Sequence, residues 1–155
     1  MDSCPFMITV VGYKNSGKTT AIEGLVKALS IQGYRVGTFK HCHHGFELDQ
    51  PGKDSWRHRK AGSAGTVLMG PEGFALMGDI PPGGDPRPLA GWLFGEADLV
   101  LAEGFHWLPL PRIEIAGSDG KVRPAHPDGK VVGRLPYRFN KADIETLCDL
   151  ILVDF

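Results

Sequence analysis

The stretch "GYKNSGKTT", residues 12–20, decides the fold of this 155-residue chain. It follows the apolar run "MITVV" and places four residues between Gly12 and the triplet Gly17-Lys18-Thr19. This is the phosphate-binding pattern G-x-x-x-x-G-K-[ST], in which glycines let backbone N–H groups face phosphate oxygens. The lysine supplies a charge for the β- and γ-phosphates, and the threonine hydroxyl a ligand for Mg²⁺. The pattern predicts a nucleotide–magnesium site, with phosphate contacts from Gly12, Tyr13, Lys14, Asn15, Ser16, Gly17, Lys18, Thr19 and Thr20.

The sequence around this loop predicts strands that alternate with helices. A strand at 7–12, a helix from Gly17 that Gly33 stops, and a strand at 35–40 form a βαβ unit with a right-handed crossover. Further on we expect a polar helix over 52–62, capped by Asp54 or Ser55, and paired strands at 65–70 and 73–78. The remaining elements are a helix over 88–97 that Gly91 interrupts, strands at 98–105 and 112–117, and an amphipathic helix over 142–155. This order predicts an α/β fold of the P-loop NTPase type: three layers, a mainly parallel sheet with helices on both faces, and one domain over 1–155.

Composition narrows the range of partners. Lys and Arg total 17 against 18 Asp and Glu, a net charge of −1, so nucleic acid is not an expected partner. The three cysteines form no C-x-x-C pair, which is typical of a reduced, intracellular protein. No run approaches the roughly 18 apolar residues that span a bilayer, and the N-terminus leads directly into a strand. We therefore expect a cytoplasmic protein that does not enter the membrane.

A magnesium site beside a P-loop needs a carboxylate from a neighbouring strand. The strand "DLVLAEG" offers Asp98 and Glu103, which stand about 16 Å apart along an extended chain, so only one can reach the site. Ligands collect at the carboxyl ends of strands in parallel sheets. We therefore predict Glu103, with Thr19, as the magnesium ligand and Asp98 as a turn residue at the other end.

Histidines gather directly after the strand at 35–40, where we expect the strand order to reverse. His41, Cys42, His43 and His44 are consecutive, and His41 and His43 would share a face if the strand continued. Imidazole and thiolate together could bind a transition metal. The spacing matches no fixed metal motif, so we favour a polar loop that responds to nucleotide and in which Asp49 also makes hydrogen bonds.

Four stretches together resemble a known family. "VVGYKNSGKTT", "GYRVGTFKH", "HHGFELDQPGKDSWRHRKAG" and "DLVLAEGF" occur in this order and are similar to the molybdopterin-guanine dinucleotide biosynthesis protein B (MobB) family. The resemblance covers most of residues 7–115, and "PGKDSWRH" is much more specific than the P-loop. It implies a homodimeric, GTP-binding protein with weak GTPase activity that assists the molybdopterin guanylyltransferase in attaching GMP to molybdopterin. It also implies a switch-like or partner-facing role for Asp49 and for residues 54–58. Tyr13 stands where a related ATPase branch has an extra lysine, which argues against that branch.

A possible guanine-reading motif occurs near the C-terminus. Asn140-Lys141-Ala142-Asp143 spells N-K-x-D, in which the aspartate accepts hydrogen bonds that guanine can donate and adenine cannot. This motif normally follows a buried strand, whereas "GRLPYRF" contains Pro136 and makes a poor one. The alternative is that Asn140 or Asp143 caps the terminal helix.

Two other functions remain open from the sequence. A small-molecule kinase would use the same phosphate site, with Asp49 as a catalytic base and Arg57 and Arg59 on a lid. A metallochaperone GTPase would carry its metal on His41–His44. The chain offers no obvious catalytic dyad beyond the phosphate site, so we predict a nucleotide-dependent adaptor, with Trp56, Arg57 and Arg59 available for contact with a partner.

Overall fold

The computed structural model describes residues 5–154 of the chain. These divide into two compact units: one runs up to His41 and resumes at Asp85, and the other is Cys42–Gly84. We call them the sheet unit and the hairpin unit, and describe each by itself. The expectation of one domain over 1–155 stays a prediction.

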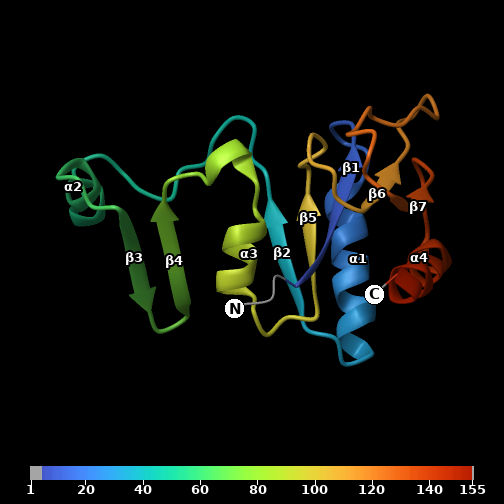
Figure 1. The fold of residues 1–155 in the computed structure, drawn as a ribbon, viewed down its shortest axis with the longest axis horizontal. Helices are drawn as coiled ribbons and strands as arrows, with labels where there is room; N and C mark the ends of the chain where they lie inside the picture. Colours follow the sequence, from blue (N-terminus) through green and yellow to red (C-terminus); the bar gives the residue numbers. More distant parts are fainter. Residues whose placement is uncertain (1–4, 155) are drawn as a thin grey trace. The chain divides into compact units, whose positions relative to one another are not determined.

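The sheet unit is built on five parallel strands, which Figure 1 shows in the order β2-β5-β1-β6-β7. Their bounds are β1 Phe6–Gly12, β2 Val36–Lys40, β5 Leu99–Glu103, β6 Arg112–Ile115 and β7 Val131–Leu135. β1 is central and buried on both faces, as a strand covered by helices on both sides must be. It pairs with β5 through Val10 and Glu103, and with β6 through Gly12 and Ile115. The parallel register brings the carboxyl ends of these strands to one edge of the sheet.

Helices cover both faces of this sheet. α1 (Lys18–Ile31) and α4 (Lys141–Asp154) bury a stripe that includes Leu25 and Ile151 against one face. α3 (Arg87–Leu93) packs Ala90 against Met7 and the other side chains of the opposite face. The predicted three-layer α/β fold with a parallel sheet is therefore confirmed. None of the helices within residues 5–154 has the length and apolarity needed to cross a bilayer.

The hairpin unit contains α2 (Asp54–Lys60), β3 (Gly65–Gly70), β4 (Gly73–Gly78) and a short 3₁₀ turn, η1 (Pro82–Gly84). β3 and β4 form the predicted antiparallel pair, from Gly65 opposite Gly78 to Gly70 opposite Gly73. The predicted cap of α2 is wrong. Lys53 is the N-cap residue and makes no side-chain capping bond, whereas Asp54 is the first helical residue and accepts a hydrogen bond from the Ser55 N–H.

Three predictions for the sheet unit also need correction. α3 runs through Gly91, which is buried, and ends at Leu93 instead of extending to 97, because the backbone of Phe94 leaves the helical conformation. The segment around Pro136 does contain a strand: β7 ends at Leu135, one residue before the proline that would interrupt it. β2 ends at Lys40 on the edge of the sheet, with β5 between it and β1, so the strand does not continue to His43 and no reversal of strand order occurs beside it.

Candidate functional site

The predicted phosphate loop joins the central strand to the N-terminus of α1. Asn15 and Gly17 both have positive φ values, 61° and 90°, so the chain makes two left-handed turns before the helix begins. A Cβ atom on Gly12 would collide with the Ser16 hydroxyl and come within 3.1 Å of the Ile115 carbonyl oxygen. Gly17 caps α1 without a side-chain hydrogen bond, and the first turn of the helix carries no acidic residue. The helix therefore presents uncapped N–H groups and a positive dipole end, which fits a phosphate group.

Ser16 also indicates that this loop fits a phosphate group. Its side chain is buried, and its hydroxyl has no hydrogen-bond partner among the protein atoms described. Buried hydroxyls are normally paired, because an unpaired one costs about 1–3 kcal/mol. A loop that leaves such a group unpaired is shaped to receive polar atoms from outside the chain.

Lys18 turns back over the phosphate loop. Its Nζ donates hydrogen bonds to the carbonyl oxygens of Tyr13, at 2.7 Å, and Gly12, at 3.3 Å. Burial lowers the pKa of Lys18; Glu103 opposes that shift, while Arg123 and then Lys40 add to it. The ammonium group thus lies in a partly desolvated position among other cations, where an anionic ligand would be held strongly.

Thr19 and Glu103 meet as the strand register predicted. Thr19 Oγ1 donates a hydrogen bond of 3.2 Å to Glu103 Oε2. Glu103 is largely buried, and Lys40 Nζ lies 3.7 Å from the same oxygen. Asp98 lies at the opposite end of β5, where its carboxylate accepts a 2.6 Å hydrogen bond from the Arg35 backbone N–H. The two side chains predicted to bind magnesium are therefore adjacent, and both are oxygen donors of the kind Mg²⁺ prefers.

Three further residues near this edge, Arg123, His106 and Lys40, were not predicted as site residues from the sequence. Arg123 Nη2 lies 2.9 Å from His106 Nε2, and Lys40 pairs with Glu103. Next to Arg123 in the chain, the Val122 carbonyl accepts a hydrogen bond of 3.5 Å from the Tyr13 hydroxyl. Arg123 comes from an irregular segment after β6, for which no motif exists. The basic character of that segment was the only available signal.

Asn140 and Asp143 form a reciprocal cap at the start of α4. Asn140 Oδ1 accepts from the backbone N–H groups of Ala142, at 2.8 Å, and Asp143, at 3.3 Å. Asp143 Oδ2 accepts from the Asn140 N–H at 2.7 Å. This is the helix-capping arrangement that the sequence left open as the alternative. Contact with guanine would require breaking these bonds, and it stays a prediction.

The histidine segment is divided between the two units. In the sheet unit, the His41 ring packs at 4.7 Å from the Trp107 ring and at 5.5 Å from the Phe105 ring. In the hairpin unit, Cys42 is half-buried, whereas His43 and His44 are exposed. Among residues 5–154, no group of three or more His, Cys, Asp or Glu side chains is placed to hold a metal ion. The arrangement of His41 is that of an aromatic packing residue.

Asp49 and the exposed side chains of α2 belong to the hairpin unit. Asp49 Oδ1 accepts hydrogen bonds from the Ser55 hydroxyl, at 2.8 Å, and from the Gln50 N–H, at 3.0 Å. Arg57 and Arg59 are exposed, and Trp56 is half-buried with Lys60 Nζ 5.5 Å from its ring centroid. Asp49 thus fixes the chain before α2, and a role for it as a catalytic base stays a prediction.

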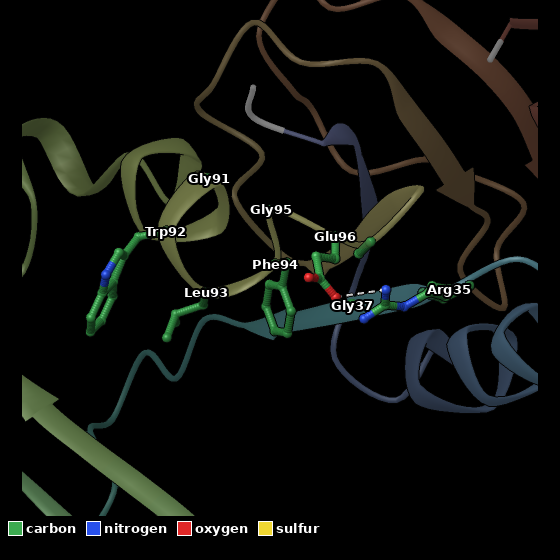
Figure 2. A pocket seen from close by; sticks show the side chains of 10 residues that line it. Arg35, Gly37, Gly91, Trp92, Leu93, Phe94, Gly95 and Glu96 are labelled. Carbon is green, nitrogen blue, oxygen red and sulfur yellow. Dashed lines mark hydrogen bonds and ion pairs between the residues drawn. The ribbon is translucent and has the colours of Figure 1, made fainter. Parts of the chain in front are cut away.

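A pocket of about 720 Å³ lies on the sheet unit, away from the phosphate loop of the same unit. Figure 2 shows it beside the start of β2 and the turn that follows α3, with Trp92, Phe94 and the ion pair of Arg35 and Glu96 around it. It is therefore at the amino ends of β2 and β5, whereas Lys18 and Glu103 lie at the carboxyl edge. This pocket is no part of the phosphate site.

Comparison with known proteins identifies the family. The family model described as "Molybdopterin guanine dinucleotide synthesis protein B" matches residues 7–132. The chain belongs to this family. The resemblance to the MobB family that the sequence indicated is thereby confirmed.

Two similar proteins are named molybdopterin-guanine dinucleotide biosynthesis adapter proteins. The one from Haemophilus influenzae is 40% identical over 113 residues, which are 69% of this chain and 61% of that protein. The one from Escherichia coli is 35% identical over 121 residues, 76% of this chain and 69% of that protein. The chain thus spans about two thirds or less of the lengths of these relatives.

Solved MobB structures share the fold. The crystal structure of Bacillus subtilis MobB has a TM-score of 0.64 at 28% identity, covering 96% of this chain and 97% of that one. A crystal structure titled molybdopterin-guanine biosynthesis protein B has a TM-score of 0.71 at 21% identity, covering 97% of this chain and all of that one. At that identity the second likeness speaks for the fold alone.

Proposed function

We propose that this MobB-family protein binds GTP with magnesium at the loop 12–20 and acts as an adaptor in molybdenum cofactor biosynthesis. One observation carries the nucleotide part of this proposal. The uncapped start of α1, the half-buried ammonium of Lys18 and the adjoining oxygens of Thr19 and Glu103 all lie at the carboxyl edge of β1 and β5. We infer the preference for guanine over adenine from the family, whose name refers to a guanine dinucleotide.

Magnesium fits the donor atoms present. Thr19 and Glu103 would hold the ion, which when bound neutralises charge on the phosphates of the nucleotide. Lys18 would exchange its two hydrogen bonds to loop carbonyls for contacts with phosphate oxygens. The N–H groups of the loop and of the first turn of α1 would bind the remaining oxygens.

An adaptor with weak GTPase activity fits the chain better than a fast enzyme. The curated relatives are named adapter proteins, and Asp49, the one candidate base, is hydrogen-bonded within the hairpin unit. The partner we propose is the molybdopterin guanylyltransferase, bound by a homodimer of this chain in the cytoplasm. The exposed Arg57 and Arg59 offer donors for this contact.

Calorimetric titration of the purified protein tests the proposal. We expect Mg²⁺-dependent binding of GTP that is at least about tenfold tighter than binding of ATP, a difference of roughly 1.4 kcal/mol. Turnover of GTP should be slow, and pull-down of the guanylyltransferase should depend on the nucleotide. Rapid phosphotransfer to a small metabolite, without association in either nucleotide state, would favour a kinase instead.

Glu103→Gln should separate the metal role from general effects of charge. We expect roughly tenfold weaker Mg²⁺-dependent GTP binding, because the amide keeps the shape of the side chain but loses the negative charge that holds the ion. Binding without Mg²⁺ should change little. The matched control is Asp98→Asn at the other end of β5, which should leave both affinities unchanged; the reverse pattern would remove Glu103 from the magnesium site.

A further inference from the structure

The segment between β6 and β7 folds back toward the phosphate loop. Its start makes a tight turn, in which the Gly117 N–H donates to the Lys121 carbonyl at 2.8 Å. The Val122 carbonyl accepts from the Tyr13 hydroxyl of the phosphate loop. Later in the segment, the His126 N–H donates to the His106 carbonyl at 2.8 Å, and the His126 carbonyl accepts from Arg112 Nη1 at 3.0 Å. Contacts on either side thus fix the position of Arg123.

Arg123 differs from the other arginines of the chain. Apart from Arg112, which pairs with the buried Glu114, it is the only arginine in residues 5–154 whose side chain is not exposed. No carboxylate in that part of the chain pairs with it. A half-buried guanidinium without a carboxylate is costly, so such a group commonly serves to bind an anion.

His106 holds the guanidinium from one side only. A guanidinium can only donate, so the 2.9 Å contact requires His106 Nε2 to accept a hydrogen bond, and the imidazole must therefore carry its proton on Nδ1. Arginine has five N–H donors, and this contact uses one of them. The others remain available for a planar or tetrahedral oxyanion.

The surroundings of Arg123 carry an excess of positive charge. Arg123 and Lys40 both act on the ammonium of Lys18, and Glu103 is the carboxylate that opposes them there. The whole chain has a net charge of −1, so this local excess is not a general property of the protein. It suits a ligand with several negative charges, such as a nucleoside triphosphate.

We propose that Arg123 contacts the terminal phosphate group of the bound nucleotide and that His106 is its positioning residue. The inference rests on the proposed nucleotide site and adds a determinant within this chain that distinguishes triphosphate from diphosphate. The loop N–H groups bind phosphates that both nucleotides share, and Lys18 reaches the β-phosphate as well as the γ-phosphate. Arg123 comes from a different segment and follows Val122, whose carbonyl contacts Tyr13 of the loop.

Titration of GDP and of a non-hydrolysable GTP analogue, both with Mg²⁺, tests this role. Arg123→Ala should weaken binding of the analogue roughly 10- to 100-fold, the range expected for a lost hydrogen-bonded charge, and change GDP binding less than about threefold. Arg123→Lys should retain part of the preference, since it keeps the charge but not the fork of donors. Arg35→Ala, which removes one positive charge at the opposite edge of the sheet, should leave both affinities unchanged.

The His106 variants test positioning. His106→Leu should reduce the preference for the triphosphate, whereas His106→Gln should restore it, because the glutamine amide oxygen can accept the hydrogen bond from Arg123. A purely structural role for His106 would make both variants equally poor. Equal losses for the two nucleotides in Arg123→Ala, or no loss in either, would overturn the inference while leaving the nucleotide site intact. Failure of the unmodified protein to bind GTP would overturn the proposed function and the inference with it.

Discussion

Lys18→Ala should lower the affinity for GTP by roughly 100-fold or more, the effect of losing charge-assisted hydrogen bonds to two phosphate groups. The fold should survive, because the ammonium bonds only to the carbonyl oxygens of Gly12 and Tyr13 and supports no core residue. Calorimetry measures the affinity and circular dichroism the melting temperature. The matched control is Lys27→Ala, which removes an exposed lysine from the same helix and should leave the affinity unchanged.

The pH dependence of binding gives an independent check on Lys18. Burial lowers the pKa of Lys18 in the free protein, whereas a bound phosphate would raise it by favouring the charged form. Binding therefore depends on the protonated lysine, and affinity should fall as the pH rises through the lowered pKa, earlier than for an ordinary lysine. The alanine variant should lack this decline. Unchanged GTP affinity in Lys18→Ala would remove the phosphate-site assignment.

The parts of this site that follow from local rules were predictable from the sequence. The spacing of Gly12, Gly17 and Lys18 requires a particular sequence of backbone angles, and the left-handed φ values of Asn15 and Gly17 have that origin. The choice of Glu103 over Asp98 required only the direction of a parallel strand, because that direction decides which end of β5 faces the loop. Both predictions, the phosphate loop and Glu103, required only one strand and the segment next to it.

Arg123 was not predictable for the opposite reason. Its position depends on its own contact with His106 and on the contact of the neighbouring Val122 with Tyr13, and neither partner shares a motif with it. Asn140 and Asp143 show a second limit. The same four letters satisfy a base-reading motif and a helix cap, and only the hydrogen bonds to backbone N–H groups distinguish the two. Gly91 shows a third limit, since α3 continues through this buried position despite the poor helix propensity of glycine.

Glu114→Gln should destabilise the sheet unit by about 3 kcal/mol at neutral pH, as is typical when one partner of a buried ion pair is removed. Glu114 is 4% exposed, and its two carboxylate oxygens accept hydrogen bonds from Arg112 Nε, at 2.8 Å, and Arg134 Nε, at 2.7 Å. The substitution leaves the Arg112 guanidinium, which is itself largely buried, without a counter-charge. Chemical denaturation measures the change, which corresponds to a melting temperature lower by roughly 10 °C for a chain of this size.

Low pH should remove the stabilisation of the folded state that Glu114 provides. Burial alone would raise the pKa of this carboxyl group, but the hydrogen bonds and charges of Arg112 and Arg134 outweigh burial and lower the pKa. A carboxylate whose pKa is lowered on folding stabilises the protein above its unfolded pKa, and this stabilisation is lost as the pH falls through the folded value. The free energies of unfolding of the wild type and Glu114→Gln should therefore converge below about pH 4. The control is Glu96→Gln, which breaks the exposed pair with Arg35 and should change stability by less than about 0.5 kcal/mol at any pH. If the two substitutions had equal effects, burial of the Arg112–Glu114–Arg134 cluster would contribute nothing to the stability of the sheet.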